Sequence, residues 1–247
     1  MNFSNSAALL AVRGVGKTYE TGKKEIRALS NVSLEAKEGE FVSIIGQNAS
    51  GKSTLLKILA GVGMPTSGVF ELRGDASYMP QDHALLPWRT VEGNLLLPAD
   101  IAGASRGRAQ EKARALLSAF GLEQYARLYP AALSGGTKQK AALLRTVLHD
   151  HSLLLLDEPF APLDALTRIE AQTWLLALLE KTEASVLLVT HDIREAIFLS
   201  DTIYVLGSGR IKEKFDVPIP RPRRHEQLRA PEALELEKRL FSLLAPV

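Results

Sequence analysis

The chain has 247 residues, enough for one sizeable domain with a buried hydrophobic core, and its hydrophobic fraction of 46% leaves no room for a long disordered tail. Its 30 Lys and Arg against 28 Asp and Glu give a net charge of +2, too even a balance to favour nucleic acid or an anionic lipid surface as the main partner. The absence of cysteine excludes disulfides, thiolate metal sites and a cysteine nucleophile.

Short apolar runs alternate with amphipathic segments along the chain, which predicts a largely parallel sheet covered by helices. The runs at residues 41–45, 153–156 and 186–189 are uninterrupted, as expected for central strands buried on both faces. We therefore predict an α/β fold within a single domain spanning residues 1–247.

The first chemical motif follows the 41–45 run directly and opens a helix at about residues 55–60. It consists of Gly46, Gln47, Asn48, Ala49, Ser50, Gly51, Lys52, Ser53 and Thr54. This spacing, in this strand–loop–helix context, matches the phosphate-binding P-loop. The glycines allow backbone N–H groups to point at phosphate oxygens, Lys52 would reach the β- and γ-phosphates, and Ser53 would ligate Mg²⁺. The alternative, a structural Gly/Ser turn, gives no reason for a lysine at this position.

Helical spacing replaces the strand pattern between residues about 85 and 148, which predicts a helical subdomain. Near its end lies the motif Leu133, Ser134, Gly135, Gly136, Thr137, Lys138 and Gln139. Ser134 is a natural N-cap for the apolar-faced segment that follows.

The 153–156 run ends in Asp157 and Glu158, and ligands of such a sheet bind at the carboxyl ends of its strands. Asp157 is suited to hold Mg²⁺, and Glu158 to polarise an attacking water. Taken alone, this pair is as consistent with a solvated strand end as with a site. His191 follows the 186–190 run, where a lone histidine is more often an ordinary surface or core residue.

Two further features close the chain. Residues 202–206 and 210–212 flank Gly207, Ser208 and Gly209, which predicts a hairpin. A tail at about 217–247 begins with alternating Pro and Arg at 217–224, which excludes a regular helix there, and continues into an amphipathic stretch at 232–244.

The Leu-Ser-Gly-Gly motif with Gln139 resembles the signature of ABC (ATP-binding cassette) ATPases, and the resemblance extends from about residue 10 to 244. It implies a P-loop NTPase fold with a RecA-like core, an antiparallel β subdomain and an α-helical subdomain. It also implies that Tyr19 stacks on adenine, that Gln81 approaches Mg²⁺ and the water, that His191 contacts the γ-phosphate, and that Asp164 lies in a loop crossing a dimer. Ala49 stands where such sequences often have Gly, and we expect little cost provided that the backbone there avoids positive φ.

The run at residues 81–88, together with 159–168 and the Pro/Arg tail, resembles the nitrate/sulfonate/taurine importer ATPases. This resemblance implies that two copies sandwich two ATP molecules, each between the P-loop of one copy and the signature of the other. It further implies a membrane permease, a separate solute-binding protein, and a peripheral place on the cytoplasmic face of the inner membrane. The surface around residues 81–94 is the expected docking site for the permease, although the apolar residues there are equally consistent with core packing.

Two alternatives remain open at this point. One is an ABC ATPase that clamps nucleic acid or ribosomes without transport, although the near-neutral charge argues against nucleic acid as a partner. The other is a regulatory nucleotide-binding subunit with little hydrolysis, against which the presence of Asp157, Glu158 and His191 argues. The transported solute is not encoded in any residue identified here.

Overall fold

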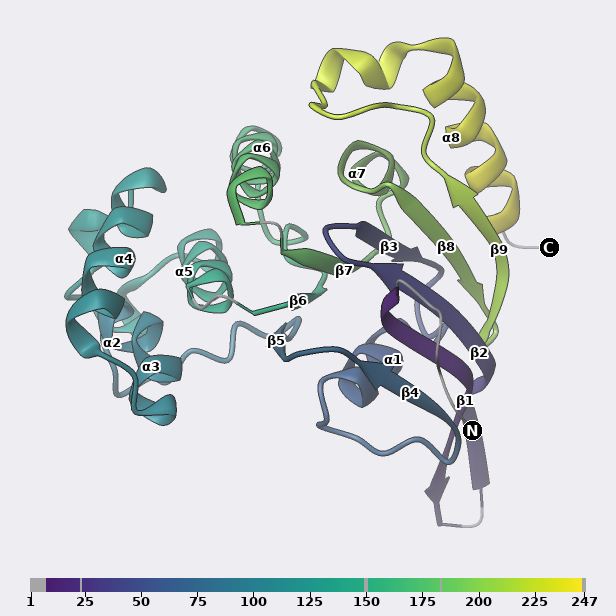
Figure 1. Ribbon diagram of the computed structural model, residues 1–247, viewed down its shortest axis with the longest axis horizontal. Helices are drawn as coiled ribbons and strands as arrows, with labels where there is room; N and C mark the ends of the chain where they lie inside the picture. The colour runs from purple at the N-terminus through teal and green to yellow at the C-terminus, as the bar shows by residue number, and fades with distance from the viewer. Residues whose placement is uncertain (1–7, 23, 149–150, 183, 246–247) are drawn as a thin grey trace.

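A computed structural model describes residues 8–22, 24–148, 151–182 and 184–245. Within these residues the chain forms a large sheet, a small sheet and a group of helices set apart from both (Figure 1). None of the helices in the described ranges is both long and apolar enough to cross a membrane.

The large sheet has the strand order β5-β6-β7-β3-β8-β9. The strands are β3 (Phe41–Ile45), β5 (Ala76–Met79), β6 (Leu153–Asp157), β7 (Ser185–Thr190), β8 (Thr202–Gly207) and β9 (Arg210–Asp216). All neighbours are parallel except β8 and β9, which form the predicted hairpin, with β9 four residues longer than expected. Every residue of β3, β6 and β7 is buried, as their uninterrupted apolar runs predict.

The small sheet is antiparallel, in the order β2-β1-β4, and consists of β1 (Ala8–Thr21), β2 (Lys24–Lys37) and β4 (Ser67–Leu72). Helix α1 (Lys52–Leu59) lies between the two sheets (Figure 1). Its buried Leu55 and Leu56 share one hydrophobic core with Val42 and Ile44 of β3 and with residues of β1 and β2. Because α1 is packed from both sides, the loop that precedes it has a fixed place at the end of β3.

The other face of the large sheet carries α6 (Ala165–Thr182) and α7 (Ile193–Leu199) (Figure 1). Phe41 of β3, Leu154 and Leu156 of β6 face this side, in a second core that also includes α5 (Gly135–Val147) and α6. Successive residues of each strand therefore serve different cores, as the two-residue period of a strand requires.

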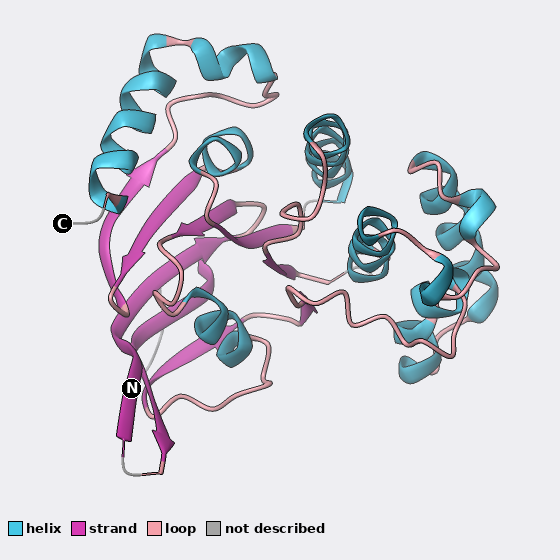
Figure 2. Cartoon of the chain, turned by 180° about the vertical axis from the view of Figure 1, so that it is seen from behind, coloured by secondary structure: helices cyan, strands magenta, loops and turns pink. Residues whose placement is uncertain are grey.

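The helical group contains α2 (Val91–Leu95), α3 (Leu97–Ala102), α4 (Arg106–Ala119) and α5, with 3₁₀ turns η1 (Glu123–Tyr125) and η2 (Pro130–Ala132). Figure 2 shows α2, α3 and α4 gathered away from the strands, with α5 between them and the large sheet. Trp88, just before α2, is 71% exposed, so core packing is wrong as an explanation for this residue. Leu85, by contrast, packs against the core of the helical side.

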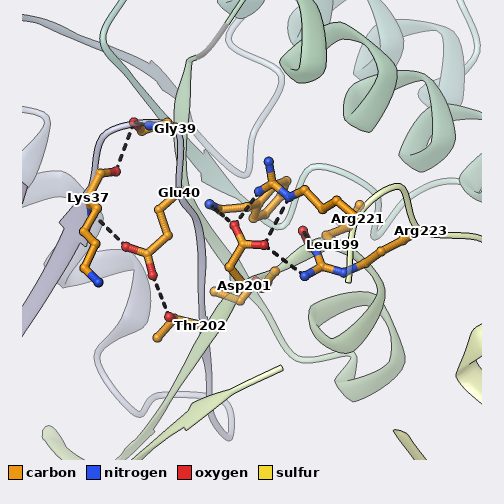
Figure 3. A network of polar contacts seen from close by, with 12 residues as sticks. Lys37, Gly39, Glu40, Leu199, Asp201, Thr202, Arg221 and Arg223 are labelled. Atoms are coloured by element: carbon orange, nitrogen blue, oxygen red, sulfur yellow. Dashed lines mark hydrogen bonds and ion pairs between the residues drawn. The ribbon is translucent and has the colours of Figure 1, made fainter. Parts of the chain in front are cut away.

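The Pro/Arg segment at 217–224 forms no regular helix, as predicted, and leads into η3 (His225–Arg229) and α8 (Pro231–Leu244). The last two residues of the predicted tail lie outside the described ranges. Arg221 and Arg223 both contact the carboxylate of Asp201, which also accepts a hydrogen bond from the Phe41 backbone N–H at 2.9 Å (Figure 3). These contacts attach the tail to the large sheet where β3 and β8 begin, at the opposite ends of the strands from the candidate site.

Candidate functional site

A cavity of about 530 Å³ lies at the carboxyl ends of the parallel strands. Four segments reach it, because β3, β5, β6 and β7 all run in the same direction and end at the same edge. The predicted residues that line it are Asn48, Ala49, Ser50, Gly51, Lys52, Ser53, Thr54, Gln81, Glu158 and His191. The fold therefore brings most of the predicted phosphate and water groups together in one cavity.

The loop between β3 and α1 is held against neighbouring backbone. Gly51, with φ of 102°, is the N-cap residue of α1, and a Cβ on it would lie 2.5 Å from the carbonyl oxygen of Ala28. The β8–β9 hairpin holds the loop from the other side, since the Gly209 N–H donates to the Ser50 carbonyl at 3.2 Å. A side chain at residue 51 would displace the loop, so glycine is required there.

Ala49 has φ of 62°. The expectation that its backbone avoids positive φ is therefore wrong. In this left-handed region the methyl group approaches the following carbonyl, at a cost of about 1–2 kcal/mol for a non-glycine residue. The loop accepts this strain because its neighbours on both sides fix its course.

Lys52 is 6% exposed, and its ammonium donates hydrogen bonds to the carbonyls of Gly46 and Gln47, both at 2.9 Å. Burial lowers the pKa of Lys52, while the nearby carboxylates of Glu158 and Asp157 oppose that effect. The side chain is thus folded back over its own loop with its charge at the floor of the cavity. The oxygens of a bound phosphate would compete with these two carbonyls for its protons.

Asp157, the last residue of β6, is 1% exposed and accepts a hydrogen bond from the Ser53 hydroxyl at 3.0 Å. Burial raises its pKa, the Ser53 hydrogen bond lowers it, and neighbouring Glu158 raises it further. Two hard oxygen donors from different elements therefore meet here, which is the donor chemistry that Mg²⁺ requires. Tyr78 was not among the residues predicted from the sequence. Its burial and the negative charge of Asp157 together raise the pKa of Tyr78 to about 12.

Glu158 has φ of 51°, a left-handed conformation outside the regular strand. Its Oε2 lies 3.2 Å from Nδ1 of His191, which directly follows β7, and the side chain of Glu158 is 14% exposed. Strained backbone at such a position is typical of functional sites. A carboxylate positioned by a histidine at the mouth of a cavity can accept a proton from a water molecule.

The remaining predicted residues lie away from this cavity. Tyr19 is 41% exposed on β1 and does not line the cavity, whereas Ala28 of β2, which sequence reasoning missed, does. No pattern marks a single small residue such as Ala28. Asp164 accepts a hydrogen bond from the Thr167 N–H at 3.1 Å, and hydrogen bonds from Thr167 lower its pKa.

The predicted signature also lies outside the cavity. Ser134 caps α5, with its hydroxyl oxygen accepting from the Thr137 N–H at 3.2 Å, as predicted. Ser134 and Gly135 are exposed, but Leu133 and Gln139 are buried in their own subunit. Gln139 donates to the Pro159 carbonyl at 2.8 Å and contacts His83, so its side chain connects α5 to the segment after Glu158.

Comparison with known proteins gives a consistent result. A family model described as "ABC transporter" matches residues 29–161. An uncharacterized ABC transporter ATP-binding protein of Methanocaldococcus jannaschii is 37% identical over 245 residues, covering 95% of this chain and 91% of that protein. The aliphatic sulfonates import ATP-binding protein SsuB of Escherichia coli strain K12 is 41% identical over 241 residues, which cover 94% of this chain and 90% of that protein.

Among solved structures, the dimeric post-hydrolysis state of the ATP-binding cassette MJ0796 bound to ADP and Pi matches with a TM-score of 0.79. The two sequences are 31% identical, and the match covers 85% of this chain and all of that one.

Proposed function

This chain belongs to the ABC transporter family and is an ATPase of that family, and on that premise we propose that it energises the import of a small solute of the sulfonate type. The observation that carries the proposal is the convergence of four strand ends on one cavity, where Lys52, Glu158 and His191 lie together. The names of the import relatives support the transport role over a clamp on nucleic acid or ribosomes.

We assign the chemical step to Glu158. Its carboxylate would accept a proton from the water that attacks the γ-phosphate, and His191, 3.2 Å away, would hold the carboxylate in place. Lys52 would leave the loop carbonyls for the β- and γ-phosphate oxygens, whose charge matches its own. Gln81, which lines the same cavity, would orient the water.

Ser53 and Asp157 are the residues that would hold Mg²⁺, together with Gln81. A bound Mg²⁺ would neutralise part of the phosphate charge. Asp157, with its raised pKa, gains from such a cation because a positive charge favours its ionised form.

The exposed Ser134 and Gly135 support a dimer in which each signature meets the ATP of the other copy. The first N–H groups of a helix have no partner within it, so the exposed start of α5 favours anionic phosphate. Tyr19, at the exposed end of the β1–β2 hairpin, remains the proposed partner of the adenine ring.

We further propose a membrane permease as partner, with a separate solute-binding protein, and a place on the cytoplasmic face of the inner membrane. The exposed Trp88 beside α2 supports docking through residues 81–94, because large aromatic side chains dominate protein interfaces. Copurification of a multi-span membrane protein from gently solubilised membranes is the expected result. Recovery of ribosomes or nucleic acid instead would favour the clamp function.

The substitution Glu158→Gln tests the assignment of the chemical step. It keeps the size of the side chain but removes the proton acceptor, so we expect ATP turnover to fall by at least about 100-fold with ATP binding retained. Phosphate release and fluorescent-nucleotide binding measure the two quantities. Glu123→Gln, an exposed change in the helical group, is the matched control and should leave both unchanged. Unaltered turnover in Glu158→Gln would exclude this carboxylate as the base.

A further inference from the structure

A second cavity, of about 420 Å³, lies between α6, α7 and the C-terminal segment formed by η3 and the start of α8. Figure 1 shows this segment passing over α7 on the side of the large sheet that also carries α6. The cavity shares no lining residue with the proposed nucleotide cavity. It is within the volume range of small-molecule sites.

Three buried polar atoms of residues that line this cavity have no hydrogen-bond partner among the described residues: Oε1 of Glu195, Nε of Arg168 and Nε2 of His225. Glu195 is only 5% exposed, and its other oxygen accepts from Nε2 of Gln172 at 3.2 Å. Buried polar atoms are nearly always satisfied, and leaving one unpaired is costly. Three such atoms around one cavity therefore indicate an occupant with polar atoms of its own.

The charges around the cavity favour an anion. Arg168, Arg194 and Arg229 line it, against Asp192 and Glu195. Burial raises the pKa of Glu195 to about 8, so near neutral pH this carboxyl group carries a proton and is a neutral hydrogen-bond donor. Arg168 is paired with Asp192 at 3.5 Å and Arg194 with Glu237 at 2.8 Å, so with Glu195 neutral the group has one positive charge in excess, that of Arg229.

The remaining walls are largely apolar, formed by Ile169, Phe198, Leu228 and Leu234. The ring of His225 stacks on Phe198 with the centroids 3.8 Å apart. Burial lowers the pKa of His225, so the ring is uncharged at neutral pH and offers one polar nitrogen on an apolar surface. An occupant with both a charged group and a hydrocarbon part fits such a lining.

We propose that this cavity binds a small organic anion, with its acidic group among Glu195, Arg168 and Arg229 and its hydrocarbon part against Phe198 and Leu228. The nitrogen donors and the protonated carboxyl group are suited to the oxygens of a carboxylate or sulfonate. Asp192, which lines this cavity and caps α7, directly follows His191 of the proposed nucleotide cavity. The bound anion would thus lie against the element that positions His191.

Isothermal titration of the whole chain with 1-butanesulfonate tests the proposal, with pentanoate as the carboxylate analogue and butylammonium as the cation of matched size. We expect saturable binding of the sulfonate or the carboxylate and none of the cation. Arg229→Leu removes an exposed cation from the cavity and should weaken binding about tenfold. Arg108→Leu, the same change on exposed α4, should leave binding unchanged.

A sulfonate also resembles a phosphate group, so the P-loop is the competing site. Lys52→Ala separates the two: binding that persists in Lys52→Ala and weakens in Arg229→Leu supports the second cavity. Leu228→Trp places a larger side chain in the second cavity and should abolish anion binding there. No saturable binding of either anion, equal binding of butylammonium, or loss in Lys52→Ala with full binding in Arg229→Leu would each overturn the proposal.

Discussion

Among single side chains, Glu195 is a buried carboxyl group whose pKa lies far above its usual value. The residue is 5% exposed within α7, and burial raises its pKa to about 8 from the usual 4.5, against the opposing effects of Thr190, Arg168 and Gln172. A carboxyl group in this position is protonated over most of the physiological pH range. Its effect on stability therefore depends on pH.

Between pH 4.5 and about 8 the folded chain retains a proton on Glu195 that the unfolded chain releases. Titration of Glu195 should therefore lower the free energy of unfolding by about 1.4 kcal/mol for each pH unit in this range. Below pH 4.5 both states are protonated, and this group no longer makes the free energy of unfolding depend on pH. Glu195→Gln cannot titrate, so its stability relative to the parent should rise by about 3 kcal/mol from pH 5.5 to 7.5. Urea unfolding at both pH values measures this difference, and a constant difference would show that Glu195 is ionised in the folded chain.

At this scale the sequence predicts residue types well and conformations poorly. Lys52 and Ser53 open α1, Asp157 ends β6 and Glu158 follows it, and these positions place all four residues in or beside the cavity. The positive φ of Ala49 was not predictable, because alanine rarely adopts it and only the contacts of the folded loop impose it.

Among the elements, the Pro/Arg segment is held by Arg221 and Arg223 to different degrees. The side chain of Arg223 is 2% exposed, and it donates to the carbonyls of Ile219 and Leu199 and to Asp201, each at 2.9 Å (Figure 3). The side chain of Arg221 is 31% exposed, and its polar contacts among the described residues are with Asp201. Arg223 is therefore the main attachment of the segment that leads to α8.

Removing Arg223 leaves two carbonyls and part of a carboxylate without their donor. We expect Arg223→Leu to lower the free energy of unfolding by about 2–3 kcal/mol. Arg221→Leu, at the more exposed partner of the same carboxylate, should cost less than about 1 kcal/mol. Urea unfolding of the two variants compares them, and equal losses would mean that the buried hydrogen bonds of Arg223 add nothing to the ion pair.

The sequence predicts the central strands but not how they pair. Continuous apolar runs identify β3, β6 and β7, yet β3 pairs with β7 across some 140 residues of chain, which no local pattern encodes. The long strands β1 and β2 have a mixed polar pattern, and their pairing is interrupted by register shifts near Val15, so the two-residue period is weak. Only the family resemblance predicted the antiparallel subdomain to which β1 and β2 belong.

For the whole molecule, the central prediction is that each active site is shared between two copies. Lys52→Ala disables the P-loop and Ser134→Arg places a bulky cation in the signature, so each variant alone should lose ATP turnover. In a mixed dimer, one site combines the intact P-loop of the Ser134→Arg chain with the intact signature of the Lys52→Ala chain. Mixing should therefore restore a measurable fraction of the parent rate.

The assay is phosphate release at a fixed total protein concentration with varied mixing ratios, and the highest rate is expected near equal amounts. Two Lys52→Ala preparations mixed with each other provide the control. Failure of the mixture to recover any turnover, with ATP binding by Ser134→Arg intact, would place the signature's action within its own subunit.

The end of α8 lies beside the phosphate loop, although almost the whole chain separates them. Nε2 of Gln47 donates to the carbonyl of Leu244 at 2.6 Å, and Lys212 holds the neighbouring carbonyl of Leu243 at 3.0 Å. A fluorescent dye attached at residue 245 would consequently sit at the rim of the nucleotide cavity and report its occupancy. A bulky purification tag fused at the same point would crowd that cavity, whereas one inserted in the loop before α4 would lie far from it.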